Sequence, residues 1–341
     1  MKAVRPTIFC CFLFIGTILS AQKVDSVRFF VDEPPLNVTL TTDMGKLMSE
    51  KMKGELLKAT FSTKLYDSTV VDEEIRINAR GVYRRKYCYI PPMRLSFLNT
   101  SSSRLRSLKA LKMVSGCTIN KQAEQLLLKE YLVYKIHNLL TPKSFLARLA
   151  KVTYRDSKGK KKPFTQYAFF LENVDAMAKR NHCKEWKSGP VNYNMLEREE
   201  TTMMFVFQYM IGNTDWGLTN NHNLKIIYGK KDTSTTPFAV PYDFDYSGLV
   251  NAEYAVPNEE LGITNVVQRL YRGFPRSTME LQAVFDVFNR QKEKIYNVIS
   301  DFELLDKRNK KEMLAYLDDF YKTISQKWEV QSIFIKNARQ Q

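Results

Sequence analysis

Carboxylate and amide side chains gather in one stretch of the chain, between Gly212 and Gly248. They flank two short apolar runs, each of which predicts a strand. The side chains are those of Asp215, Asn220, Asn223, Asp243 and Asp245. Oxygen ligands at the ends of two neighbouring strands are what a site needs to hold a divalent cation against phosphate oxygens. The stretch therefore predicts a metal-assisted phosphate site.

Other elements must position these side chains. Residues 197–211 predict a helix that is apolar nearly all round after its first turn and is therefore buried. It delivers the chain directly to Asp215. Upstream, a helix is predicted over residues 121–140, and Glu130 falls on its apolar side. A carboxylate that faces inward needs a cation, and Lys112 on the preceding predicted strand is the nearest candidate.

A basic segment begins at Arg80, where Gly81 is followed closely by Arg84, Arg85 and Lys86. A glycine turn followed by three cations is suited to lie over phosphates. It is equally typical of an exposed hairpin, and the sequence leaves both interpretations open.

The order of the elements predicts the fold class. Mostly β-like segments and one long helix occupy residues 22–172, and helices dominate residues 173–341. A β-rich part followed by a helical part that carries the polar site is the arrangement of a two-lobed, protein-kinase-like α+β fold. We place the boundary between the two parts near residue 173.

The candidate residues also occur in the order of kinase motifs. Ala110-Leu111-Lys112 resembles the strand lysine motif, and Glu130 stands where the partner glutamate of that lysine is expected. Phe170-Leu171-Glu172 resembles the strand that leads into the kinase hinge. Asp243-Phe244 resembles the start of the metal motif, with Asp245 in place of its glycine. The chain has no glycine-rich loop and no His-Arg before Asp215, which excludes an ordinary eukaryotic protein kinase.

The motif Asn-x-Asp-Trp at residues 213–216, followed by His222-Asn223 and by Pro-Tyr-Asp-x-Asp at 241–245, resembles the CotH family of atypical secretory kinases. The resemblance covers roughly residues 70–325. It implies an ATP-dependent kinase that uses Mg²⁺ or Mn²⁺ and transfers the γ-phosphate to a Ser or Thr hydroxyl of a protein acceptor.

The resemblance also implies a role for each candidate residue. Lys112, Glu130, Arg80 and Glu172 would bind the nucleotide, and Asp215 would accept the proton of the acceptor hydroxyl or orient that hydroxyl. The implied metal ligands are Asp243, with Asp245 beside it, and Asn223 or Asn220. Three alternatives stay open: a catalytically inactive kinase-like surface binding module, AMP transfer, and a metal-dependent hydrolase. The presence of only three histidines counts against the hydrolase.

The first 21 residues read as a cleaved signal peptide with two basic residues and an apolar run from Ile8 to Leu19. We therefore expect a periplasmic, cell-surface or secreted protein that is not a lipoprotein and whose mature chain is not inserted in a membrane.

Cleavage of the signal peptide lowers the net charge of the chain from +16 to about +14. A basic chain suits an anionic ligand such as a nucleotide. Its charges are scattered without a nucleic-acid motif, so we expect no nucleic-acid partner.

Three cysteines follow the predicted signal peptide, an odd number that does not indicate a disulfide scaffold. Cys88 and Cys117 lie at the edges of predicted strands. They can form a pair in an oxidising compartment.

Overall fold

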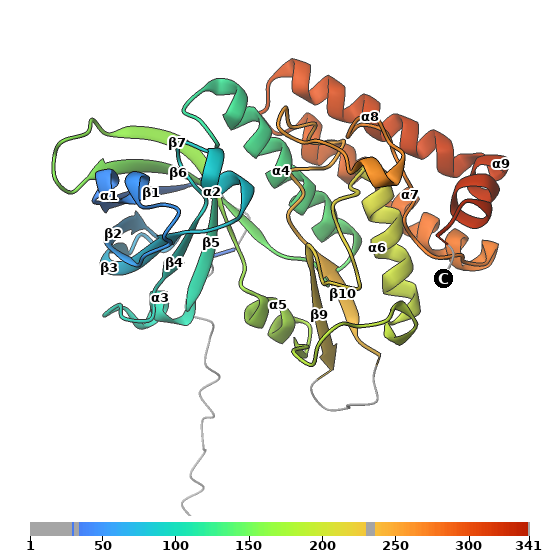
Figure 1. Ribbon diagram of the computed structural model, residues 1–341, viewed down its shortest axis with the longest axis horizontal. Coiled ribbons are helices and arrows are strands. Elements are labelled where there is room, and N and C mark those ends of the chain that lie inside the picture. Colours follow the sequence, from blue (N-terminus) through green and yellow to red (C-terminus); the bar gives the residue numbers. More distant parts are fainter. Residues whose placement is uncertain (1–28, 31–33, 230–235, 340–341) are drawn as a thin grey trace, which may run out of the picture.

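The computed structural model describes residues 29–30, 34–229 and 236–339 (Figure 1). The predicted signal peptide lies outside these residues. A search of the described helices for one with the length and apolar character to cross a bilayer finds none.

Seven strands of the first half close into a barrel with the order β1-β2-β3-β4-β5-β7-β6. Neighbouring strands pair antiparallel, except that β1 pairs parallel with β6 and so closes the barrel, from Leu36 opposite Ala150 to Thr42 opposite Asp156. The strands are β1 (Leu36–Thr42), β2 (Leu57–Lys64), β3 (Val70–Ala79), β4 (Met93–Ser96), β5 (Ala110–Ser115), β6 (Ala147–Asp156) and β7 (Phe164–Leu171).

Alternation along the barrel strands separates an apolar interior from an outer face. On β5, Leu111 and Met113 point inward and are buried, whereas Lys112 and Val114 point outward. The interior is filled with large side chains, among them Phe61, which is fully buried. Short helices connect these strands: α1 (Met44–Ser49), α2 (Tyr83–Tyr87) and α3 (Ser103–Ser107).

A second, three-stranded sheet of order β10-β9-β8 lies in the other half, among helices (Figure 1). Its strands are β8 (Cys183–Glu185), β9 (Leu224–Gly229) and β10 (Phe238–Pro241). The helices from β5 onward are α4 (Lys121–Leu140), α5 (Val174–Arg180), η1 (Tyr193–Met195), α6 (Arg198–Met210), η2 (Glu259–Leu261), α7 (Thr278–Ser300), α8 (Lys307–Ser325), α9 (Lys327–Val330) and the π-helical turn η3 (Gln331–Lys336).

The predicted two-lobed protein-kinase-like fold with a helical second lobe is wrong, although the α+β class is right. The strands of the first half do not form an open β lobe, because β1 joins β6 and closes the sheet into a barrel. The second half is not purely helical, since it contains the three-stranded sheet. Strand pairing between residues more than a hundred positions apart is not visible in local periodicity, and this is why the prediction failed.

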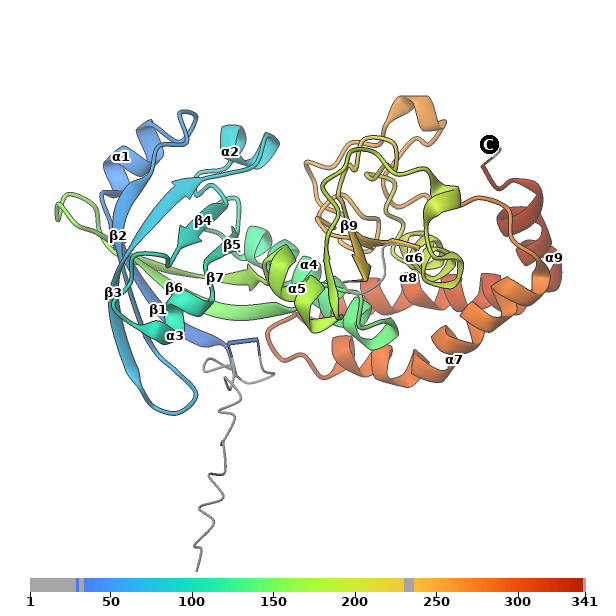
Figure 2. The same ribbon diagram turned by 90° about the horizontal axis from the view of Figure 1, so that it is seen from below.

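Helix α4 lies between the barrel and the helices of the second half (Figures 1 and 2). Because it is covered on both sides, even its polar residues Lys129, Glu130 and His137 are buried. Asn120 caps its first turn by accepting a hydrogen bond from the Ala123 N–H at 2.8 Å. The position of α4 brings Glu130 to the junction between the two halves.

Candidate functional site

The ring of Phe244 anchors the Asp243-Phe244-Asp245 segment that follows β10. It is fully buried, with its centroid 4.7 Å from the ring of Tyr134 on α4 and 5.5 Å from that of Phe207 on α6. Neighbouring side chains of an irregular segment point in different directions, and the deep burial of Phe244 fixes both flanking carboxylates. Asp243 and Asp245 enter two different groups of charged residues.

The backbone of Asp243 adopts the left-handed conformation, with φ of 68°, and Asn223 does the same with φ of 51°. Residues other than glycine rarely occupy this region, although Asn and Asp do so more often than most. The Asp243 N–H donates to the Tyr134 hydroxyl at 2.8 Å, which helps to hold the conformation. Two such residues at the ends of adjoining strands are the kind of local strain that clusters at functional sites.

Asp245 belongs to a group that we call the Arg84 cluster, in which two buried carboxylates meet the partly buried side chains of an arginine and a tyrosine: Arg84, Glu130, Asp245 and Tyr254. Arg84 Nη1 lies 3.2 Å from Glu130 Oε2 and 3.9 Å from Asp245 Oδ2. The Tyr254 hydroxyl donates to Asp245 Oδ2 at 3.0 Å. Arg84 also donates to the Ser115 carbonyl. Glu130 therefore faces inward and pairs with a cation as predicted, but the cation is Arg84 of α2 and not Lys112.

Burial dominates the electrostatics of the Arg84 cluster. It raises the pKa of Glu130, and the nearby Arg84 guanidinium opposes this rise. Burial and, next, the neighbouring charge of Asp243 raise the pKa of Asp245 to about 6. Asp215 adds a smaller effect in the same direction. The three carboxylates of the predicted site are therefore close enough to influence one another.

A disulfide fixes the helix that carries Arg84. Cys88 caps the C-terminus of α2 and is bonded to Cys117, in the connection between β5 and α4. The pairing that the sequence left open is present. It ties α2 to the polypeptide that leads into α4, and so holds Arg84 beside Glu130.

Asp243 belongs to a second group of charged residues, which we call the Lys112 cluster: Arg80, Lys112, Lys225 and Asp243. Burial and, to a smaller extent, the charges of Arg80 and Lys225 lower the pKa of Lys112 to about 8, while Asp243 and Glu185 oppose the shift. Within the part of the chain that the structure describes, no carboxylate lies within ion-pair distance of the Lys112 Nζ. The Nζ lies instead 4.3 Å from the ring centroid of Tyr242.

Lys225, on β9, is the one member of the Lys112 cluster with a described ion pair, to Glu185 Oε1 at 3.2 Å. The predicted cofactor residues Arg80 and Lys112 are thus brought together with the predicted metal ligand Asp243. Glu130, predicted to orient Lys112, lies in the other cluster.

Asp215 lies on the loop after α6, where Gly212 makes a close approach possible: a Cβ on Gly212 would lie 2.0 Å from the Tyr316 hydroxyl oxygen. One oxygen of Asp215 lies 2.8 Å from His222 Nε2, and the other accepts from Asn223 Nδ2 at 3.0 Å. Asn213 supports the loop by accepting the Asp215 N–H at 3.0 Å. The Asp215 side chain keeps 39% of its surface exposed, so a substrate can reach it.

Asn220 and Glu172 are used in local contacts. The Asn220 Oδ1 accepts the His222 N–H at 3.1 Å, inside the turn enclosed by the Gly217–His222 bridge just before β9. Glu172 is buried, and its Oε2 accepts hydrogen bonds from Arg180 Nη2 at 2.9 Å and from the Leu146 N–H at 3.2 Å. The structure therefore does not bring these two predicted residues into either charge cluster.

Several residues of the site were missed by sequence reasoning: Arg84, Tyr134, Tyr254, Lys225 and Glu185. Arg84 was singled out only as one of three cations in a turn, and that turn is the helix α2. Lys225 directly follows Asn223-Leu224 and alternates with buried apolar residues on β9, which marks it as an outward-facing strand residue. No local signal identifies Tyr134 or Tyr254.

The described residues contain no group of three or more His, Cys, Asp or Glu side chains arranged to hold a metal ion. Asp243 makes no side-chain hydrogen bond to another described residue, and Asn223 uses its Nδ2 for Asp215. The Asp243 carboxylate and the Asn223 Oδ1 are hard oxygen donors of the type that Mg²⁺ and Mn²⁺ prefer. They fit a site in which water and phosphate oxygens supply the remaining ligands.

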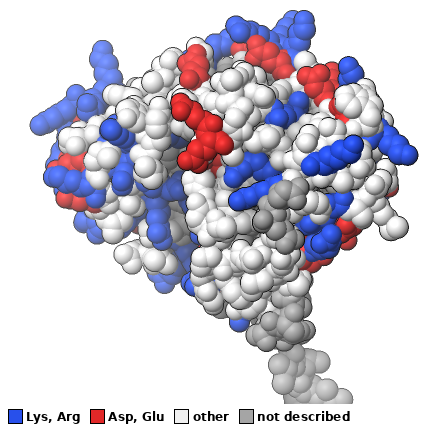
Figure 3. Space-filling view, turned by 45° about the vertical axis from the view of Figure 1, so that its right-hand side comes forward, with Lys and Arg blue, Asp and Glu red and all other residues white. Residues whose placement is uncertain are grey.

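Basic and acidic side chains are interspersed on the face shown in Figure 3. Lys and Arg side chains occur over most of that face, with smaller acidic groups between them. A continuous basic stripe of the kind that follows a nucleic-acid backbone is not seen on this face.

No known protein-family model matches this chain, and no curated protein matches it significantly.

Proposed function

We propose that the chain is a metal-dependent phosphotransferase that moves the γ-phosphate of ATP to a hydroxyl of a protein acceptor. One observation carries this proposal: the Nζ of half-buried Lys112 lies 4.3 Å from the ring of Tyr242, the residue before Asp243, and has no carboxylate within ion-pair distance among the described residues. The charges of Arg80, Lys225 and Asp243 are near enough to shift the Lys112 pKa. Unpaired cations next to an oxygen ligand are what a polyphosphate and its cation require together. The motif-level resemblance to the CotH family supports the same chemistry, and it concerns the site rather than the fold.

Each residue has a role in this proposal. Arg80 and Lys112 bind phosphate oxygens, and a bound anion raises the pKa of Lys112 back toward its ordinary value. Asp243 and the Asn223 Oδ1 hold Mg²⁺ or Mn²⁺. That ion, when bound, neutralises charge on the β- and γ-phosphates.

Asp215 acts on the acceptor. Its carboxylate orients the acceptor hydroxyl and receives the proton as the oxygen bonds to the γ-phosphorus and the bond to the β–γ bridging oxygen breaks, which releases ADP. His222, 2.8 Å from Asp215 Oδ1, and Asn223 hold that carboxylate in place.

The test is incubation with ATP labelled at the γ- or the α-phosphate, with Mn²⁺ and a mixture of exported proteins as acceptors. We expect label from γ-labelled ATP only, and a loss of at least about 100-fold in Asp243→Asn and Asp215→Asn. Asp286→Asn, an exposed aspartate on α7, is the matched control and should keep full activity.

Other outcomes identify the alternatives. Label from α-labelled ATP would indicate AMP transfer. Nucleotide binding by calorimetry without transfer would indicate an inactive binding module. Equal labelling by the wild type and all three variants, or no binding of nucleotide at all, would refute the proposal.

A further inference from the structure

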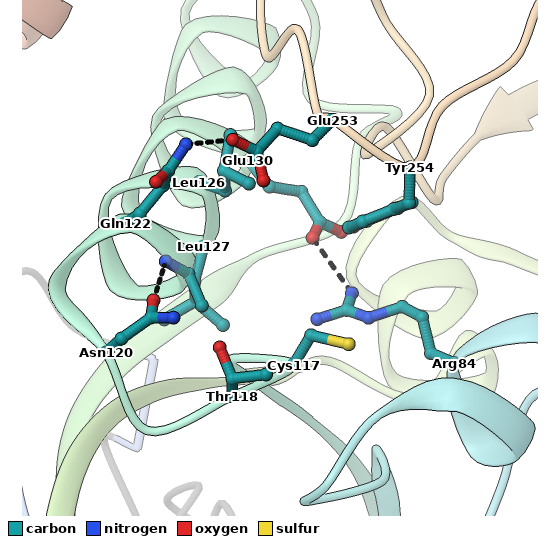
Figure 4. Close-up of a pocket in the computed structure, with 11 residues that line it drawn as sticks. Arg84, Cys117, Thr118, Asn120, Gln122, Leu126, Leu127, Glu130, Glu253 and Tyr254 are labelled. Carbon is teal, nitrogen blue, oxygen red and sulfur yellow. Dashed lines mark hydrogen bonds and ion pairs between the residues drawn. The ribbon is translucent and has the colours of Figure 1, made fainter.

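The partly buried arginines Arg84 and Arg272 have different kinds of partner. Arg84 points toward the carboxylate of Glu130 and forms an ion pair with it (Figure 4). Arg272, in the irregular segment between η2 and α7, has no carboxylate within ion-pair distance among the described residues. Its Nη1, which carries two N–H groups, donates instead to the backbone carbonyls of Thr214 and Trp216. The guanidinium of Arg272 is therefore directed at the backbone of one loop.

The residue between these two carbonyls is Asp215, which receives the acceptor proton in the proposed reaction. The charge of Asp215 reaches Arg272, since it opposes the fall in the Arg272 pKa that burial and, next, Arg339 produce. The carbonyl of Asp215 itself accepts from Asn223 Nδ2 at 2.8 Å. A hydrogen bond from a charged donor is roughly twice as strong as one between neutral groups. Arg272 therefore holds the backbone on both sides of Asp215.

The segment that carries Arg272 is itself fixed by packing on α6. Phe274, two residues later, is buried, and its ring centroid lies 6.0 Å from that of Phe205 on α6. Phe205 in turn stacks on Trp216, with 5.6 Å between the ring centroids. Arg272 therefore links the loop that carries Asp215 to the buried core of the second half.

We infer that Arg272 is a positioning residue for phosphotransfer, which holds the loop so that the Asp215 carboxylate meets the acceptor hydroxyl. The effect on the reaction rests on the proposed function, whereas the effect on the loop does not. A displacement of a reacting group by about 1 Å can cost about 100-fold in rate. Arg272 has no described hydrogen bond or ion pair with Lys112 or Asp243, so it should act on the maximal rate and not on the KM for ATP.

The first test is Arg272→Met in the transfer assay with γ-labelled ATP and Mn²⁺. Methionine removes the donors and keeps a side chain that can lie against Trp216, whose ring centroid is 5.0 Å from the Arg272 Cζ. We expect the maximal rate to fall about 10–100-fold at an unchanged KM for ATP. Arg272→Lys keeps a charged donor and should recover part of this loss. Arg290→Met, the same substitution at an exposed position of α7, should equal the wild type.

The second test follows the loop without any reaction, through the indole of Trp216. Its Nε1 donates to the Asn213 carbonyl at 3.1 Å, and the residue is only 4% exposed. In ¹H–¹⁵N spectra of Arg272→Met we expect this signal to shift and its N–H to exchange with solvent at least about 10-fold faster. The other two tryptophans, Trp186 and Trp328, are internal references and should keep their signals. If Arg272→Met does not fold, Arg272→Lys should show the same local shift at smaller size.

The outcomes separate this inference from the proposed function. An unchanged Trp216 signal in a folded variant would overturn the inference, whether or not the chain transfers phosphate. A shifted signal with an unchanged maximal rate, or a raised KM for ATP alone, would also overturn it. Absence of transfer by the wild type would refute the proposed function and the catalytic role together, and the Trp216 signal would still show whether Arg272 holds the loop.

Discussion

The two charge clusters on either side of Phe244 differ in how their charges are satisfied. In the Arg84 cluster, one guanidinium lies 3.2 and 3.9 Å from two buried carboxylates, and a tyrosine hydroxyl completes the group. In the Lys112 cluster, Lys112 and Arg80 are half-buried and have no described carboxylate within ion-pair distance. The first cluster is closed by the protein itself, and the second is open to a ligand.

This difference suggests separate tasks: the Arg84 cluster stabilises the fold, and the Lys112 cluster binds a ligand. A buried ion pair adds little net stability, but losing one partner leaves a buried charge unsatisfied and is costly. An unpaired, partly solvated cation costs little to remove, since the folded protein gains little from its charge. We therefore expect substitutions in the Arg84 cluster to affect folding, and substitutions in the Lys112 cluster to affect ligands.

The largest expected effect on folding is that of Glu130→Ala. Removing the carboxylate leaves Arg84 buried with Asp245 alone at 3.9 Å, so we expect a loss of about 3–5 kcal/mol in the free energy of unfolding. Urea denaturation followed by circular dichroism measures this.

The double substitution Arg84→Met and Glu130→Met is the control, because it removes both charges together. It should cost clearly less than Glu130→Ala. A loss below about 1 kcal/mol in Glu130→Ala would mean that the Arg84 cluster does not hold the fold.

A smaller effect concerns pH. Burial and Asp243 raise the pKa of Asp245 from its ordinary value of 3.8 to about 6, so the folded state binds this proton more tightly than the unfolded state. The resulting stability is fully present below about pH 4 and is lost as the pH rises through about 6, an effect of about 2–3 kcal/mol.

Asp245→Asn should remove this part of the pH dependence, while the contribution of Glu130, whose pKa is also raised, remains. Free energies of unfolding at pH 4, 5, 6 and 7 for the wild type, Asp245→Asn and the exposed control Asp301→Asn provide the check. Parallel curves for the wild type and Asp245→Asn would show that Asp245 does not titrate in this range.

The smallest expected effect on folding is that of Lys112→Met. Methionine keeps the aliphatic length and removes a charge whose burial is unfavourable, so the free energy of unfolding should change by less than about 1 kcal/mol. The affinity for Mg²⁺-ATP should nevertheless fall about 10-fold or more. Titration calorimetry beside urea denaturation separates the two effects. A large loss of stability with unchanged affinity would reverse the comparison.

Local elements of the fold were predictable from the sequence. The predicted bounds of α4, residues 121–140, agree with the structure, since Asn120 caps the first turn of the helix. The barrel was not predictable, because it depends on the parallel pairing of β1 with β6. Hydrophobic alternation shows that a strand has a buried face and does not show which strand lies beside it.

The candidate site was predicted only where its residues are close together in the sequence. The segments that carry Asp215, Asn223 and Asp243 are neighbours in sequence through the hairpin of β9 and β10, and the structure brings them together. The inward position of Glu130 followed from helical periodicity. Its partner Arg84 did not, because α2 reaches α4 only through the barrel and the Cys88–Cys117 bond.

The parallel pairing of β1 with β6 also constrains how the chain reaches its folded state. Strand β1 finds its second neighbour only when residues about 110 positions later have been made, which at typical synthesis rates is several seconds or more after β1 leaves the ribosome. During that interval β1 and β2 form an incomplete sheet with an exposed hydrogen-bonding edge. Long-range closure of this kind makes folding slow and favours association between nascent chains.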